Sequence, residues 1–331
     1  MAVYTHLTAE VLASLIAHYD VGELVSAKGI AEGVSNSNWL IETTGADGKG
    51  ARFILTMYER RIDLADLPFF LDLLDHLAAR DCPVPGTVHD REGNSHRWLG
   101  DPGSGAGAGK AVALIEFIPG VSVGEPTPAQ ARNVGMVLAQ MHAAAESFPV
   151  QRRNELGPET SARVLADCGT EALAAIDPAL PAAIAEAQRV ARDWPQDLPR
   201  SIIHSDLFPD NVLMLGERVS GLIDFYFACH DMMAYDLAVT HAAWSFADGG
   251  RTYRAEVGRA LIAGYQSVRE LLDIERRAMP LLAQGAALRF ISSRAQDWID
   301  TPADAMVTRK DPMDFHRRLH FYLREGDKVF A

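Results

Sequence analysis

The chain has 331 residues, 48% of them apolar, and its 44 acidic and 31 basic side chains give a formal net charge of -13. This length suggests about two domains, and the apolar fraction excludes a disordered chain or a small disulfide-stabilised scaffold. The acidic surplus argues against nucleic acid or an anionic membrane as the main partner, because both repel negative charge.

The cysteines and the N-terminus bear on the compartment. Cys82, Cys168 and Cys229 are too few and too scattered for a disulfide framework or a CxxC metal site. The first residues, MAVYTHLTAE, lack the basic and apolar regions of a signal peptide, and no run of about 18 apolar residues indicates a membrane span. We therefore expect a cytoplasmic protein with reduced thiols.

The N-terminal third has strand-like runs and two helical segments. Apolar residues at helical spacing from Leu7 to Ile16 predict a short helix that Thr8 caps. A second helix is predicted to begin near Pro68 and to end before Cys82. The predicted strands are 23–30, 38–43, 52–58, 97–99 and 110–118, of which the first three are expected to pair antiparallel.

After Pro119-Gly120 the strands give way to Ala-rich helical segments. Helices are predicted near 127–147, 159–174 and 179–193, with more after residue 232. This shift in composition predicts an N-terminal domain of residues 1–118 and a C-terminal domain of residues 119–331. One strand-rich island, residues 201–227, interrupts the helices.

The island reads SIIHSDLFPDNVLMLGERVSGLIDFYF, and its polar residues stand at the ends of apolar strands. Asp206 and Asn211 lie on one turn, and the chain then runs out through VLML and returns through VSGLI to Asp224. A hairpin with legs of similar length brings Asp224 back beside Asn211. We therefore expect three oxygen-bearing side chains to converge on one point.

Two carboxylates and an amide oxygen suit a hard cation such as Mg²⁺. A loop aspartate, an asparagine five residues later and a strand-end aspartate are typical of kinase-type phosphoryl transfer. Asp206 would then orient the substrate hydroxyl, Asn211 and Asp224 would hold the metal, and His204 would brace the loop. The alternative is that each is an ordinary turn residue, and it is the better explanation of any one taken alone.

At these residues the sequence resembles the aminoglycoside phosphotransferase and choline kinase group of small-molecule kinases, and within it the bacterial homoserine kinases of this type. The resemblance covers most of the chain. The segments that carry it are GIAEGVSNSNWL at 29–40, FILTMYERR at 53–61, LPFFLDLLDHLA at 67–78, HSDLFPDNVL at 204–213, SGLIDFYFACHDMMAYDLAV at 220–239 and GAALRF at 285–290.

The resemblance implies an α+β, protein-kinase-like fold of two lobes. An N-terminal antiparallel sheet with one main helix would bind ATP, and a larger, mostly helical lobe would carry catalysis and the substrate. Asp206 and His204 would be the catalytic residues, and Asn211 and Asp224 the Mg²⁺ ligands. The implied reaction is ATP-dependent phosphorylation of the side-chain hydroxyl of L-homoserine to O-phospho-L-homoserine in threonine biosynthesis.

The resemblance also implies how the nucleotide is held. The loop of residues 32–38 would cover the phosphates through Gly33 and Ser35 or Asn36. Glu116 to Ile118 looks like the hinge whose backbone meets adenine.

Two features depart from the kinase pattern. Thr56 occupies the strand position of a phosphate-pairing lysine, so another basic residue would supply the charge, with Lys28, Arg60 and Arg61 as candidates. The helix that would pair with that lysine offers Asp72 and Asp75 in place of a clearly placed glutamate.

A zwitterionic substrate needs a partner for each of its charges. Tyr226 and Asp231 lie near the site in sequence, and Arg289 or Arg294 could grip a carboxylate. The two arginines are five residues apart on one helix, so at most one is expected to be a direct ligand. Asp236, within YDLAV, is expected to be a buried acceptor that braces the catalytic loop.

Three alternatives stay open. A kinase of this fold could act on an aminoglycoside, choline or a sugar. A nucleotide-binding pseudokinase scaffold is suggested by Thr56. A homoserine kinase of the unrelated GHMP fold would need a glycine- and serine-rich phosphate loop, which the sequence lacks. The expected partner is a small molecule; the oligomeric state does not follow from the sequence.

Overall fold

The computed structural model describes residues 7–30, 36–59, 63–100, 109–301 and 309–331. Contacts within the chain divide it into two compact units, Met1–Gly120 and Val121–Ala331. This division falls two residues after the domain boundary expected from composition.

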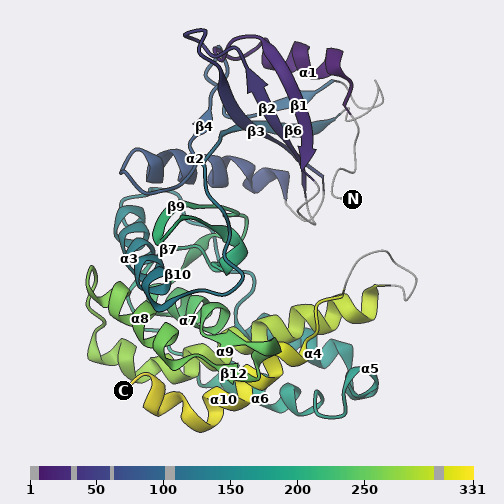
Figure 1. Ribbon diagram of the computed structural model, residues 1–331. Coiled ribbons are helices and arrows are strands. Elements are labelled where there is room, and N and C mark those ends of the chain that lie inside the picture. Colours follow the sequence, from purple (N-terminus) through teal and green to yellow (C-terminus); the bar gives the residue numbers. More distant parts are fainter. Residues whose placement is uncertain (1–6, 31–35, 60–62, 101–108, 302–308) are drawn as a thin grey trace. The chain divides into compact units, whose positions relative to one another are not determined.

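The first unit is built on one antiparallel sheet with strand order β1-β2-β3-β6-β4, and β5 pairs with β6 (Figure 1). The strands are β1 (Leu24–Ile30), β2 (Asn36–Thr43), β3 (Ala51–Tyr58), β4 (Thr87–Val88), β5 (Arg97–Leu99) and β6 (Lys110–Glu116). The predicted antiparallel pairing of the first three strands is confirmed. Strand β4 has only two residues, too few for a periodic pattern, and was not predicted.

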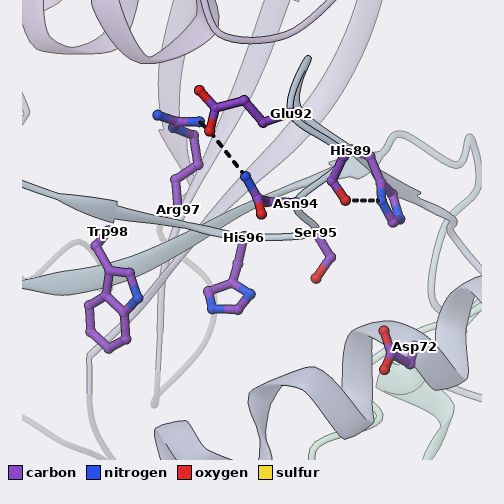
Figure 2. Close-up of a pocket in the computed structure, with 9 residues that line it drawn as sticks. Asp72, His89, Glu92, Asn94, Ser95, His96, Arg97 and Trp98 are labelled. Carbon is purple, nitrogen blue, oxygen red and sulfur yellow. Dashed lines mark hydrogen bonds and ion pairs between the residues drawn. The ribbon is translucent and has the colours of Figure 1, made fainter.

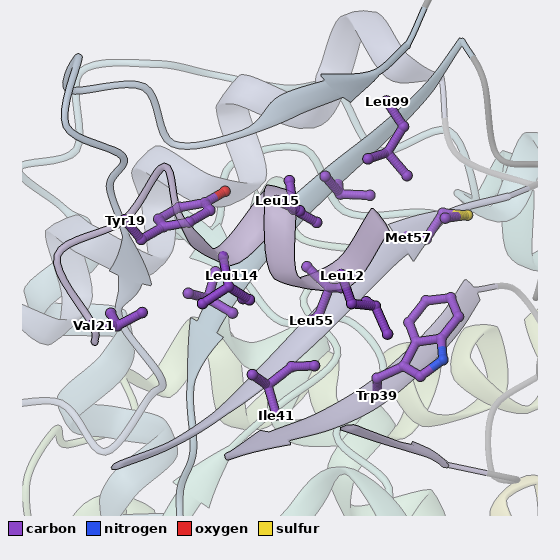
Figure 3. Packing of buried hydrophobic residues seen from close by; sticks show 12 residues of the cluster. Leu12, Leu15, Tyr19, Val21, Trp39, Ile41, Leu55, Met57, Leu99 and Leu114 are labelled. Carbon is purple, nitrogen blue, oxygen red and sulfur yellow. The ribbon is translucent and has the colours of Figure 1, made fainter. Parts of the chain in front are cut away.

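One face of this sheet packs against helix α1 (Ala9–Ile16), which Thr8 caps by accepting a hydrogen bond from the Val11 amide. Figure 3 shows Leu12 and Leu15 of α1 above Leu55 of β3 within one apolar cluster. Burial alternates along β2, as expected for a strand with one face in the core. The other helix, α2 (Leu67–Ala78), has Pro68 in its first turn, where a missing amide hydrogen costs nothing.

The second unit is mostly helical. Its helices are α3 (Pro128–Ala145), α4 (Pro158–Cys168), α5 (Thr170–Ile176), α6 (Ala182–Arg192), α7 (Met233–Trp244), α8 (Ala255–Gln266), α9 (Asp273–Asp300) and α10 (Met313–Val329). The single helix predicted over 159–174 is interrupted, because Gly169 adopts φ 78° and separates α4 from α5. Helix α9 contacts α4, α6, α7 and α10, and is the central helix of this unit (Figure 1).

Helices α3 and α8 approach each other closely through two glycines. A Cβ atom added to Gly135 would lie 2.1 Å from the Leu261 carbonyl oxygen, and one added to Gly264 would lie 1.9 Å from the Arg132 carbonyl oxygen. No larger residue fits at either position without moving a backbone. Within the described segments, no helix is both long and apolar enough to cross a bilayer.

The strand-rich island forms two small antiparallel pairs. Strand β8 (Val212–Leu215) pairs with β9 (Arg218–Leu222) as the predicted hairpin. Strand β7 (Arg200–Ile203) pairs with β10 (Cys229–Met232), which lies beyond the predicted end of the island. A third pair, β11 (Phe246–Ala247) with β12 (Thr252–Tyr253), follows α7.

Candidate active site

The residues from His204 to Asn211 form a loop between β7 and β8. Its last residues make a 3-10 turn, Pro209–Asn211, in which proline fixes the backbone. The Asn211 side-chain amide donates to the Asp206 carbonyl oxygen at 2.8 Å and lies 3.4 Å from the Asp206 carboxylate. The loop therefore holds these two side chains against each other.

The β8–β9 hairpin brings Asp224 to the same place. Its legs have four and five residues, and a bulge next to Met214 absorbs the difference. Beyond the paired ends, the Ile223 amide donates to the Asn211 carbonyl oxygen at 3.0 Å. Asp224 follows directly, so the hairpin returns it beside the backbone of Asn211, and its carboxyl lies near enough to Asp206 for the two charges to interact.

Two non-glycine residues at this point adopt left-handed backbone conformations. Ser205 has φ 68° and Asp224 has φ 65°. A non-glycine residue in this region costs on the order of 1–3 kcal/mol and persists only where its surroundings fix it. Such strain is concentrated at functional sites, and here it lies beside both carboxylates.

The electrostatics of the site favour a bound cation. Burial, followed by the nearby carboxylates of Asp206 and Asp210, raises the pKa of Asp224 to about 6. Burial also raises the pKa of Asp206, although the Arg289 guanidinium opposes it. Asp224 is nevertheless an exposed residue, so solvent and a soluble ion can reach it. Two neighbouring carboxylates and the side-chain oxygen of Asn211, whose nitrogen is turned to Asp206, are the kinds of ligand that a divalent cation such as Mg²⁺ takes.

No group of three or more His, Cys, Asp or Glu side chains arranged for a metal occurs in the part of the chain that the structure describes. A metal held here would take its remaining ligands from water or from a phosphate, as Mg²⁺ commonly does.

His204 is completely buried, and both of its ring nitrogens form hydrogen bonds that hold the backbone around the site. Its Nδ1 accepts a hydrogen bond from the Asp206 amide at 3.2 Å, which leaves Nε2 to donate to the Ile223 carbonyl oxygen at 3.0 Å. Burial lowers its pKa and so favours the neutral ring. The ring thus joins the residue before Asp224 to the backbone of Asp206.

Asp236 on α7 is the second brace, as its position within YDLAV predicts. Its carboxylate is fully buried and accepts the backbone amides of His204 and Ser205, both at 2.7 Å. His142 on α3 adds a third contact at 3.0 Å and also meets the Tyr265 hydroxyl on α8. Burial alone would raise the pKa of Asp236, but these hydrogen bonds outweigh it and keep the pKa below its usual value.

Replacing Asp236 by alanine should therefore destabilise the catalytic loop and lower the free energy of unfolding. The change leaves two backbone amides and an imidazole buried without an acceptor, and we expect a loss of about 2–4 kcal/mol in the free energy of unfolding. Urea denaturation measures it. The control is Asp193→Ala, which removes an exposed carboxylate after α6 and should change the free energy of unfolding by less than ~0.5 kcal/mol. Equal stability of the two variants would contradict the role of Asp236.

The proposed substrate ligands have different surroundings. Asp231 is buried on β10 and already bonds to the Arg200 guanidinium at 3.0 Å and the Asn154 amide at 2.7 Å. Arg289 contacts Ser205 and Asp206 in the catalytic loop. Arg294 donates to the Asp311 carbonyl oxygen and pairs with Asp314 at 3.1 Å. Tyr226, half-buried, lies two residues after Asp224.

Only some of the residues predicted to bind the nucleotide lie in the described part of the first unit. Gly33 and Ser35 lie outside the described residues, as do Arg60 and Arg61. Asn36 is buried at the start of β2, and no hydrogen-bond partner of its side-chain oxygen is found among the described residues. Lys28 is an exposed residue of β1.

Thr56, at the expected lysine position, is buried on β3 and donates its hydroxyl hydrogen to the Asn38 side-chain oxygen at 2.9 Å. A neutral pair therefore occupies the position of the usual cation. Asp75 of α2 pairs with His89 at 2.6 Å and accepts the Thr87 amide, so it binds β4 to the helix.

The predicted hinge lies at the end of β6. The Glu116 carboxylate accepts the Gly86 amide at 3.1 Å, and a Cβ at Gly86 would lie 3.0 Å from that carboxylate. Phe117 and Ile118 follow outside any strand.

A surface cavity of about 520 Å³ lies in the first unit, between α2 and the segment His89–Trp98. Figure 2 shows Asp72 on α2 at one side of the cavity, with His89 and Ser95 above it and His96 and Trp98 toward the opposite side. None of the predicted catalytic, metal or nucleotide residues lines it.

A model of a family described as "Phosphotransferase enzyme family" matches residues 26–271. Among curated proteins, a homoserine kinase of Granulibacter bethesdensis is 47% identical over 98% of this chain and 97% of its own length. One of Gluconacetobacter diazotrophicus is 48% identical over 97% of both. One of Acidiphilium cryptum is 46% identical over 98% of both.

Solved structures with the same fold are less similar in sequence. An amicoumacin kinase in complex with AMP-PNP and Ca²⁺ superposes with a TM-score of 0.67 at 15% identity, over 98% of this chain and 94% of its own. A spectinomycin phosphotransferase in complex with ADP reaches a TM-score of 0.67 at 14% identity, over 95% and 94%. These similarities confirm the predicted two-lobe, protein-kinase-like α+β fold.

Proposed function

Since the chain belongs to the phosphotransferase enzyme family, we propose that it is an ATP-dependent homoserine kinase. It would transfer the terminal phosphoryl group of ATP to the side-chain hydroxyl of L-homoserine, giving O-phospho-L-homoserine for threonine biosynthesis in the cytoplasm. The observation that supports the chemistry is the contact of Asn211 with Asp206, together with the hairpin that returns Asp224 close to both residues. The names of the relatives support the choice of substrate.

In this proposal Asp206 is the catalytic residue. Its carboxylate would accept a hydrogen bond from the acceptor hydroxyl and take its proton as the new P–O bond forms and the bond to ADP breaks. Asn211 and Asp224 would hold Mg²⁺, which would supply the positive charge that neutralises the phosphates.

The chain's main contribution is then positioning. Phosphoryl transfer passes through a loose transition state, so alignment of the hydroxyl with the phosphorus matters more than the strength of the base. His204 and Asp236 fix the backbone on either side of Ser205, and so orient Asp206.

For the nucleotide, we propose that Gly33, Ser35 and Asn36 meet the phosphates and that the backbone from Glu116 to Ile118 meets adenine. Asn36 lies at the start of β2, in the segment proposed as the phosphate loop, and its side-chain N–H group is a donor of the kind a phosphate oxygen accepts. Because Thr56 is neutral, the metal would carry more of the charge neutralisation than in a kinase with a strand lysine.

For the substrate, Tyr226 and Arg294 are the proposed contacts to the amino acid. Arg294 would bind the carboxylate through Nη2, because its Nη1 already donates to Asp311 and Asp314. Asp231 is less suited to bind an ammonium group, because its two oxygens already have partners. Its role as a ligand would require Arg200 or Asn154 to move.

A coupled assay of ADP release, run with L-homoserine, L-serine, choline and kanamycin, tests the function. We expect kcat/KM for L-homoserine to exceed that for L-serine by roughly 10–200-fold, the effect of a missing methylene. It should exceed those for choline and kanamycin by at least ~10²-fold, because neither has the carboxylate that the site would pair. Faster turnover of choline or kanamycin would reject the substrate and retain a kinase. Absence of ADP release with every acceptor would instead support a pseudokinase.

A further inference from the structure

Arg289 reaches the catalytic loop from α9, 84 residues later in the chain than Ser205. It is 4% exposed. One of its terminal nitrogens, Nη1, donates to the Ser205 carbonyl oxygen and, at 2.9 Å, to the Ser205 hydroxyl. The other, Nη2, lies 3.7 Å from the Asp206 carboxylate.

The backbone that Arg289 holds is the strained one. Ser205 has φ 68°, a conformation that glycine adopts freely and serine does not. Its amide donates to the Asp236 carboxylate at 2.7 Å, while its carbonyl oxygen accepts from Arg289. Both polar backbone groups of Ser205 are thus bound by buried charged side chains, an anion from α7 and a cation from α9.

This arrangement leaves Arg289 little capacity for another ligand. The ring centroids of Phe290 and Phe227 lie 4.8 Å and 5.5 Å from its guanidinium carbon. A bidentate grip on a substrate carboxylate needs two parallel N–H groups, and Nη1 is already committed to Ser205.

We propose that Arg289 is a positioning residue, which together with Asp236 clamps Ser205 in its left-handed conformation and thereby aims the Asp206 carboxylate. It is not a ligand of the substrate carboxylate. This inference rests on the proposed function, in which Asp206 acts on the acceptor hydroxyl.

Steady-state kinetics of Arg289→Met and Arg289→Lys test the clamp. We expect Arg289→Met to lower kcat on the order of 10²-fold with KM for L-homoserine changed less than ~3-fold, because a small misplacement costs rate and leaves binding intact. Arg289→Lys should recover part of kcat, since an ammonium can still reach the Ser205 carbonyl oxygen. Arg277→Met, at an exposed position of the same helix, is the control and should match the unaltered protein.

Ser205→Gly gives a second, more specific readout. Glycine adopts this φ without strain, so Ser205→Gly should raise the kcat of Arg289→Met at least ~3-fold. A merely structural arginine predicts no such recovery. The proposal is overturned if Arg289→Met keeps near-normal kcat, or if its main effect is a large rise in KM for L-homoserine.

Hydrogen exchange separates this proposal from the choice of substrate. Without any ligand, the backbone amides of residues 203–208 should exchange at least ~10-fold faster in Arg289→Met than in Arg277→Met. If Arg289→Met does not fold, Arg289→Lys takes its place in this comparison. Equal exchange would overturn the clamp even if L-homoserine is the substrate. Faster exchange in a protein that does not turn over L-homoserine would keep the clamp and reject only the proposed function.

Discussion

Replacing Asp206 by asparagine is expected to lower kcat about 10²–10⁴-fold, the contribution of a positioned general base. The asparagine keeps the shape of the side chain but cannot take the proton of the acceptor hydroxyl. KM for MgATP should stay within ~3-fold, because the proposed metal ligands are Asn211 and Asp224. Steady-state kinetics with L-homoserine and ATP measure both quantities.

The control for this prediction is Asp210→Asn, which changes a carboxylate on the same turn. Asp210 lies near enough to Asp224 to contribute to its raised pKa, but it is not among the converging side chains. It should lower kcat less than ~10-fold, within the range of an indirect electrostatic change. Similar kcat values for Asp206→Asn and Asp210→Asn would contradict the assignment of Asp206.

Replacing Asp224 by asparagine is expected to have opposite effects on activity and stability. Loss of a charged metal ligand should raise KM for MgATP and lower kcat by at least ~10²-fold. The metal-free protein should become more stable at pH 8, because an ionised, crowded carboxylate is removed. The folded-state pKa of about 6 lies above the usual 3.8, so ionisation of Asp224 costs stability as the pH rises through this range.

Thermal unfolding without metal at pH 8 and pH 4 measures this effect. At pH 8 the asparagine variant should melt higher by roughly 2–4 °C for each ~1 kcal/mol gained. At pH 4 the carboxyl of the unaltered protein is largely protonated, so the difference should be small. Adding Mg²⁺ with a nucleotide analogue should stabilise only the unaltered protein; a lower melting temperature of the variant at pH 8 would refute the electrostatic account.

The site could be predicted from the sequence because its geometry is local. Asn211 and Asp224 flank a single hairpin, so the length of its legs fixes their distance, and the observed register confirms the argument. The same holds for Asp236, whose place in an otherwise apolar helix segment indicates a buried acceptor.

The role of Arg289 could not be predicted in the same way. Sequence spacing indicates only that Arg289 and Arg294 point in different directions, and they do bind different partners. Which of them meets the catalytic loop depends on how α9 packs in the second unit. No local pattern records a contact 84 residues away in the chain.

The predicted secondary structure was wrong where an element is short or where a single residue sets the end of a helix. Strand β4 is two residues long, and β10 contains Cys229, His230 and Asp231, which do not give a strand pattern. Gly169 ends α4 through a positive φ, although Ala-rich sequence continues on both sides. Tertiary contacts, rather than periodicity, determine these boundaries.

The central claim is that Asn211 and Asp224 hold one divalent cation beside Asp206. Crystals grown with Mn²⁺ and a nonhydrolysable ATP analogue, measured for anomalous scattering, test it most directly. We expect one strong peak within ~2.0–2.3 Å of the Asn211 side-chain oxygen and an Asp224 carboxylate oxygen. A peak held by other side chains, with Asn211 and Asp224 turned away from it, would contradict the account.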